Sequence, residues 1–136
     1  MMAIFVLLLL GGLSVLTLQY VRIHATLFAD SYTKERAEIF WQNALEAALM
    51  RIEANKSDLN MTSDDGAFRS YVEVEKCYLY RNNKNHPNVN CPADKVEAIS
   101  TEESNGYMLL KIVVESTPHA KVLTPVRITR RSLQRP

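Results

Sequence analysis

The chain has 136 residues, which leaves room for one small domain and one membrane anchor and gives no reason to expect two domains. Its 16 basic and 15 acidic residues nearly cancel, so the charge argues against a nucleic-acid binder that relies on a clustered basic surface. The charges are unevenly placed, because residues 1–21 contain none. The average composition therefore describes neither part of the chain.

Residues 1–21 are predicted to form the transmembrane half of a long N-terminal helix. About 20 helical residues at 1.5 Å each cross a hydrocarbon core of roughly 30 Å. Gly11, Gly12 and Ser14 are small, which permits close packing of neighbouring helices in the membrane. A cleaved secretory signal is the competing interpretation, but the apolar run lacks a preceding basic residue and a small-x-small cleavage site before Arg22. We therefore expect an uncleaved anchor.

The helix is predicted to continue beyond the membrane as an amphipathic segment over 22–56. No glycine or proline occurs between residues 13 and 65, and apolar residues recur at helical spacing among charged ones. Turn-forming residues over 55–66 end this pattern. We expect the chain's own sheet to cover the helix from about residue 40 to 52. Residues 21–32 are then left without an intrachain partner, which indicates helices of other subunits as neighbours.

Residues 67–133 are predicted to form an antiparallel sheet of three or four strands. The alternating positions that indicate strands are Val72, Val74, Tyr78 and Tyr80, then Val96, Ala98 and Ser100, then Met108, Leu110, Ile112 and Val114, and last Val126 and Ile128. Turn-forming residues separate these runs. A sheet of this size needs a cover on its apolar face, so we expect it to pack on the helix in an α+β fold.

The only two cysteines, Cys77 and Cys91, lie in this predicted sheet domain. A disulfide between them would close a loop of about 15 residues and stabilise the domain by about 3 kcal/mol in the chain-entropy model. Two buried thiols are the alternative, and the spacing is unlike a CxxC redox or zinc pair. A disulfide implies an oxidising compartment, hence a periplasmic or surface location.

The charges next to the span favour the opposite orientation. Arg22, Lys34 and Arg36 follow the apolar segment and no basic residue precedes it, so the positive-inside rule would place the sheet domain in the cytoplasm. A basic leader upstream of the printed start would remove this conflict. We give the cysteines more weight and predict that the sheet domain is periplasmic or on the cell surface.

An apolar helix that leaves the membrane without a break, a sheet on its outer half and a disulfide in the C-terminal domain together resemble the type IV pilin-like proteins, including the pseudopilins of type II secretion. The residues that carry the resemblance are 1–20, the amphipathic stretch to Ile52 and the Cys77/Cys91 pair. The glutamate that the family carries near the start of its helix is missing, since Asp30 is the first acid, which resembles atypical minor members at a filament tip.

The resemblance implies a structural subunit with a single span in the inner membrane. Its partners would be the membrane and other pilin-like subunits, bound through the N-terminal helix, with no cofactor and no small-molecule substrate. The alternative function is a stand-alone anchored binding module that uses the Asn-rich loop of residues 81–90 to contact a ligand.

Residues that could carry catalysis or bind metal are few. The sequence has no HExxH, GxSxG or phosphate-binding loop. His24, His86 and His119 are expected on the surface, with a shared metal site for the last two as the alternative. Oxygen-bearing side chains gather over 58–65, but the glycine is misplaced for a calcium loop and the closing glutamate is absent, so a capped turn is expected. We predict no catalytic residues and no metal site.

Two further sequence features concern the surface. Asn55 and Asn60 each begin an N-x-S/T sequon with an acid two residues earlier, a longer form that resembles the acceptor of some bacterial glycosylation systems. The last ten residues include Arg127, Arg130, Arg131 and Arg135. Positive charge prevents unwanted pairing of an edge strand, so we interpret these arginines as an exposed strand face. Contact with DNA, anionic lipid or an acidic neighbour is the alternative.

Overall fold

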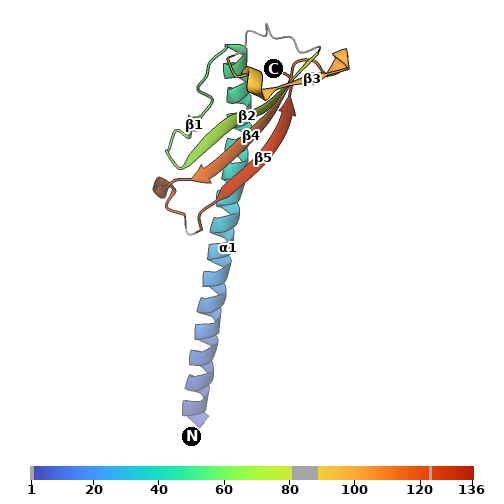
Figure 1. Ribbon diagram of the computed structural model, residues 1–136. Coiled ribbons are helices and arrows are strands. Elements are labelled where there is room, and N and C mark those ends of the chain that lie inside the picture. Colours follow the sequence, from blue (N-terminus) through green and yellow to red (C-terminus); the bar gives the residue numbers. More distant parts are fainter. Residues whose placement is uncertain (1, 81–88, 123) are drawn as a thin grey trace.

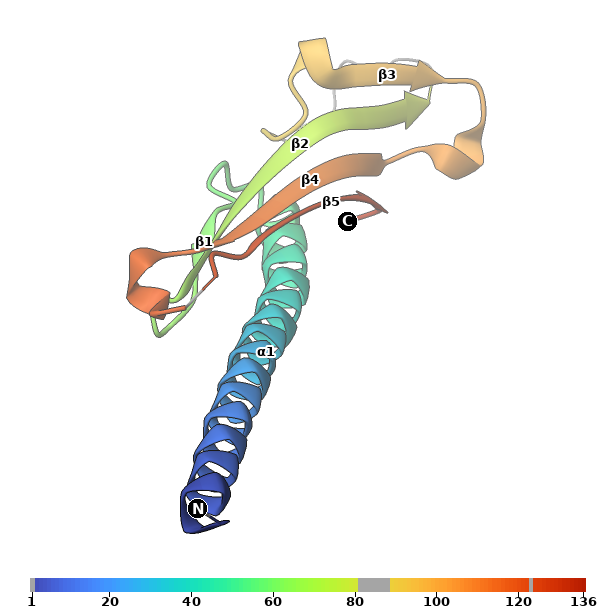
Figure 2. The same cartoon turned by 90° about the horizontal axis from the view of Figure 1, so that it is seen from below.

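The computed structural model describes residues 2–80, 89–122 and 124–136 and has one long helix packed on a five-stranded sheet (Figure 1). The predicted α+β class is confirmed. Helix α1 (Met2–Glu53) runs for 52 residues without a break, which corresponds to about 78 Å at 1.5 Å per residue. Its lower half stands free, and the sheet lies on one side of its upper half (Figure 1, Figure 2).

Helix α1 ends at Glu53, slightly before the predicted end at residue 56. Asn55 adopts a left-handed conformation with φ 54°, as the residue after a helix commonly does. The Asn55 N–H donates to the Ile52 carbonyl at 2.9 Å, and the Lys56 N–H donates to the Arg51 carbonyl at 2.8 Å. These bonds satisfy carbonyls of the last turn, so the chain can leave the helix and turn back toward the sheet.

The sheet has the strand order β1-β2-β4-β5, and β3 pairs with β2 as well. The strands are β1 (Met61–Thr62), β2 (Phe68–Tyr80), β3 (Val96–Ile99), β4 (Tyr107–Ser116) and β5 (Arg127–Gln134). Short 3-10 turns occupy Ala93–Lys95, Glu102–Ser104 and Pro118–Ala120. Strand β5 is therefore an edge strand, as the arginine-rich C-terminal sequence predicts.

One strand pair differs from the predicted antiparallel arrangement. Strand β3 runs parallel to β2, with Cys77 opposite Val96 and Tyr80 opposite Ile99. The disulfide is consistent with this direction, because Cys91 is bonded to Cys77 and the chain is thus held beside the C-terminal part of β2 before β3 begins. From that point β3 follows β2 in the same direction.

The register of β2 also departs from the sequence pattern. The pairing of β2 with β4 is irregular between Val74 and Lys76. An extra residue at such a bulge reverses which side chains face the core. Cys77 and Leu79 are therefore buried, whereas the predicted positions Tyr78 and Tyr80 are only half-buried. The four positions that predict this strand therefore lie in it, but they do not all share its inner face.

The core lies between the sheet and the upper half of α1. The helix contributes five buried residues, Ala37, Phe40, Ala44, Ala48 and Ile52. The sheet contributes a continuous inner row from β4, Met108, Leu110, Ile112 and Val114. The predicted cover over residues 40–52 is thus confirmed and begins slightly earlier. The three buried alanines allow the sheet to lie close to the helix, so this contact depends on small side chains there.

Candidate helix interface

The lower half of α1 is apolar and uncovered. Every side chain over 2–28 is exposed, and within the described residues α1 is the one helix long and apolar enough to cross a membrane. Residues 2–20 would extend about 28 Å, close to the thickness of a hydrocarbon core. Ala29 and Asp30 are the first residues that are partly covered. About 12 Å of helix over 21–28 therefore lies beyond such a span and below the sheet.

One line of small and apolar residues on the exposed surface of α1 continues from its apolar lower half up to Ile39. If one starts at Gly11 and moves alternately three and four residues along the chain as far as residue 39, every position is small or apolar except Glu35. We call this line the 11–39 stripe, and its members are Gly11, Ser14, Leu18, Val21, Ala25, Phe28, Tyr32 and Ile39. All of them are exposed. Alternate spacing of three and four is the heptad pattern by which helices pack against one another.

The 11–39 stripe and the sheet occupy opposite faces of α1. With about 100° of rotation per residue, buried Ala37 and Ala48 lie about 140° and 160° around the helix from Tyr32. Phe28 is 77% exposed and Ile39 is 60% exposed, although Ile39 lies between the buried residues Ala37 and Phe40 in the sequence. The sheet therefore leaves the stripe open even where it covers the helix.

The three residues predicted to pack helices together do not share one face. Gly11 and Ser14 belong to the 11–39 stripe, whereas Gly12 lies about 160° around the helix from Ser14, on the side where the sheet lies higher up. An added Cβ at either glycine meets no atom of the described chain within 4 Å. The Ser14 hydroxyl donates to the Leu10 carbonyl at 2.8 Å, so its polar group is satisfied within the helix.

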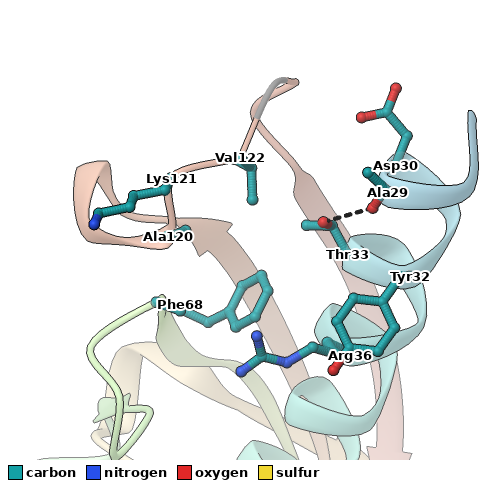
Figure 3. Close-up of a pocket in the computed structure, with 10 residues that line it drawn as sticks. Ala29, Asp30, Tyr32, Thr33, Arg36, Phe68, Ala120, Lys121 and Val122 are labelled. Atoms are coloured by element: carbon teal, nitrogen blue, oxygen red, sulfur yellow. Dashed lines mark hydrogen bonds between the residues drawn. The ribbon is translucent and has the colours of Figure 1, made fainter. Parts of the chain in front are cut away.

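A small pocket lies where the sheet domain first meets α1 (Figure 3). It has a volume of about 200 Å³ and is lined by helix residues and by the chain beside Phe68 and Lys121. Arg36 extends toward Phe68, with its guanidinium carbon 5.6 Å from the ring centroid, and it forms an ion pair with Asp65. The positive charge of Arg36 is thus paired with a carboxylate of the same chain. The pocket lies at the junction between the sheet domain and the helix.

Asp65 is held strongly in its charged form. The Ser63 hydroxyl donates to its carboxylate at 2.6 Å, the Ala67 N–H donates at 3.0 Å, and Arg36 pairs with it. These donors hold the pKa of Asp65 well below its ordinary value. Gly66 follows with φ 69°, and its N–H donates to the Ser63 carbonyl. The acidic segment is thus the capped turn that the sequence predicts, and it ties β2 to α1.

Two of the C-terminal arginines, Arg130 and Arg131, form ion pairs within the chain. Arg130 pairs with Glu38 of α1 and lies over the Trp41 ring at 5.4 Å, and Arg131 donates to Glu75 of β2 at 2.7 Å. The hydrogen bond from Arg131 lowers the pKa of Glu75 below its ordinary value. These pairs fix β5 to its neighbours, in agreement with the interpretation of the arginines as part of a strand rather than a binding tail.

The remaining candidate residues are the three histidines and the Asn-rich loop. The His24 ring lies 4.2 Å from the Tyr20 ring on the bare helix, His119 is exposed, and His86 lies outside the described residues. The described part of the chain contains no group of three or more potential metal ligands. Residues 81–88 of the Asn-rich loop are also outside it, so the binding-module alternative stays a prediction.

The predicted disulfide is present between Cys77 and Cys91, with 6.0 Å between their Cα atoms. The sequence predicted this pair. The separation of Gly11 from Gly12 was not predicted, although counting heptad positions would have revealed it. Comparison of the chain with protein-family models, with curated proteins and with solved structures found no match. The helix surface and the disulfide are therefore the features from which a function can be inferred.

Proposed function

We propose that the protein is a membrane-anchored structural subunit of the pilin-like or pseudopilin-like kind that joins other subunits through the 11–39 stripe. One observation carries the proposal: the stripe follows a heptad pattern for about eight helical turns on the face that the sheet leaves open. In a lone chain, the part of this stripe above residue 20 would face headgroups and water. Helices of other subunits would cover it.

The expected gain from such packing is substantial. Val21, Phe28 and Ile39 are more than half exposed in the single chain. Burying a side chain of this kind contributes roughly 1.5–3 kcal/mol where the alternative is water. Below residue 20 lipid replaces water, so association there depends on close contact, which small residues such as Gly11 and Ser14 permit. The stripe therefore combines both kinds of helix contact, one in the bilayer and one above it.

The disulfide supports an extracytoplasmic position for the sheet domain. Disulfides persist in oxidising compartments and are rare in the cytosol. The proposal thus has a single span in the inner membrane and the sheet domain in the periplasm or on the cell surface. The role is mechanical: α1 joins the assembly, and the domain is displayed on its outer part. The proposal assigns no catalytic residue.

The two adjacent glycines provide a test with a matched control. Gly11→Leu places a large side chain on the 11–39 stripe, whereas Gly12→Leu places the same side chain on the opposite face, and neither position is crowded within the chain. Full-length variants would be extracted from membranes in mild detergent and captured through a tagged second copy or neighbouring subunits. We expect Gly11→Leu to lower recovery of the assembly by about tenfold, the effect of about 1.4 kcal/mol. Gly12→Leu should change recovery little.

The same experiment contains the result that contradicts the proposal. Equal recovery of wild type, Gly11→Leu and Gly12→Leu would show that α1 does not join subunits through this face, as expected for a stand-alone binding module. An equal loss in both variants would remove the stripe as the specific contact. Thermal unfolding of each variant, with the disulfide intact, controls for damage to the sheet domain.

A further inference from the structure

The segment between α1 and β2 carries two sequons, at Asn55 and Asn60, that the proposed function does not use. We propose that Asn60 is an acceptor for an N-linked oligosaccharide, transferred from a lipid-diphosphate-linked donor. This proposal rests on the proposed function in one respect: in the cell, modification requires that the sheet domain is extracytoplasmic. The chemistry and the choice of Asn60 rest on the folded segment itself.

The Asn60 sequon exposes both of its essential side chains. Asn60 and Thr62 are exposed, and Met61 between them is half-buried. Asn60 directly precedes β1 and Thr62 lies in it, so an enzyme can reach the exposed Asn60 amide and Thr62 hydroxyl from the same segment. Strand β1 lies at the sheet edge and away from the N-terminal end of α1 (Figure 1). The site is therefore accessible in the folded protein.

Hydrogen bonds hold the Asn60 carbonyl and leave its amide nitrogen available. The side-chain Oδ1 of Asn60 accepts the Val72 N–H at 3.1 Å, and its backbone N–H donates to the Asp58 carboxylate at 3.2 Å. Its backbone carbonyl accepts a hydrogen bond from Arg51. Among the described residues, neither Nδ2 of Asn60 nor the Thr62 hydroxyl has a hydrogen-bond partner. The nucleophilic nitrogen is thus free on a side chain whose orientation is fixed.

The other sequon differs in its backbone conformation. Asn55 has a left-handed backbone, and its side-chain carbonyl accepts the Val89 N–H at 2.6 Å. The next residue, Lys56, is also tied down, because its carbonyl accepts the Asn90 side-chain amide at 2.9 Å. This sequon lies in the turn that ends α1 rather than in an extended chain. Asn60 instead directly precedes strand β1, so we take Asn60 as the better acceptor.

The proposed reaction is a transfer to nitrogen that consumes no oxidant. Nδ2 of Asn60 attacks the anomeric carbon of the donor sugar, a C–N bond forms and the C–O bond to the diphosphate breaks. The lipid diphosphate leaves with its electron pair, and the amide loses one proton to the enzyme or to water. The side-chain Oδ1 keeps its lone pairs, so the hydrogen bond from Val72 survives in the product.

A purified reaction tests the proposal without reference to location. The full-length protein, in detergent and with its disulfide intact, would be incubated with a purified bacterial oligosaccharyltransferase and its lipid-diphosphate-linked oligosaccharide. Intact-mass and peptide measurements should find one glycan per chain on the peptide that contains Asn60. Thr62→Ser should keep the modification and Thr62→Ala should abolish it, whereas Asn55→Gln should have no effect. Thr62 is exposed, so its variants should fold normally, which thermal unfolding checks.

Three outcomes of this reaction would overturn the proposal: no modification of the wild type, modification only after reduction and unfolding, or modification at Asn55. A second measurement separates this failure from failure of the proposed function. A membrane-impermeant amine reagent, added to intact spheroplasts, labels the sheet domain only if that domain is extracytoplasmic. A labelled domain that carries no glycan in cells overturns the modification and leaves the structural role standing. A domain labelled only after permeabilisation refutes the structural role, whatever the purified reaction shows.

Discussion

Reduction of the Cys77–Cys91 disulfide should lower the stability of the sheet domain by about 3 kcal/mol. The two cysteines are 14 positions apart, so the disulfide closes a loop of about 15 residues, and the chain-entropy model gives about 3 kcal/mol for that length. For a domain of about 100 residues, this change corresponds to a fall in Tm of more than about 10 °C. The disulfide also connects β2 to the segment that leads into the parallel strand β3.

The measurement is urea unfolding of the full-length protein in detergent, with and without a phosphine reductant. Trp41 is the single tryptophan. It is half-buried on α1, packs against the core cluster shared with the sheet and lies beside Arg130 of β5, so its fluorescence reports separation of the helix from the sheet. The double variant Cys77→Ala/Cys91→Ala is the second arm. Both sulfurs are buried in the core cluster, so this variant should lose packing as well and be less stable than the reduced wild type.

A loss of less than about 1 kcal/mol on reduction would refute the reasoning, because the covalent loop would then not limit the unfolded chain in the expected way. The double variant separates the two contributions. If it equals the reduced wild type, the buried sulfurs contribute little packing. Free thiols in the protein as extracted from its membrane would instead remove the support that the disulfide gives to an oxidising compartment.

The remaining predictions concern core packing and the pH dependence of stability. Ala44 is fully buried between α1 and the sheet, so Ala44→Leu should lower the free energy of unfolding by about 1–3 kcal/mol, whereas Leu at exposed Asn43 should have little effect in the same urea titration. Donors from Ser63, Ala67 and Arg36 lower the pKa of Asp65, so its stabilising effect is complete above about pH 4 and is lost as the pH falls further. Unfolding midpoints between about pH 5 and 2 should therefore fall less steeply for Asp65→Asn than for wild type. An equally steep fall would remove this carboxylate as a cause.

The main elements of the fold could be predicted because they depend on local periodicity. The absence of glycine and proline over 13–65 and the recurrence of apolar residues at helical spacing predict α1. The alternation from Met108 to Val114 predicts β4 and its buried face. The Cys77/Cys91 pair could be predicted from composition and spacing, since the chain has no other cysteine with which either could pair.

The details that could not be predicted depend on contacts between distant residues. The bulge near Glu75 changes the inner face of β2, and nothing in the local alternation marks it. The parallel direction of β3 is consistent with the position of Cys91 beside β2. Pairs such as Arg130 with Glu38 join positions far apart in the chain, so the sequence indicates a basic strand but not the groups that neutralise it.

The lower part of α1 has a face open to other helices, and the upper part packs on the sheet. This division agrees with a role in assembly. The heptad pattern becomes polar above Ile39, where its next positions are Gln42 and Glu46, both exposed. The buried contact with the sheet begins at Ala37 on the opposite face. The two surfaces overlap by only a few residues, so neighbouring helices could pack along the lower part of α1 without displacing the sheet. The domain would then be carried on the outside of the helix assembly, with β1 and β5 at its free edges.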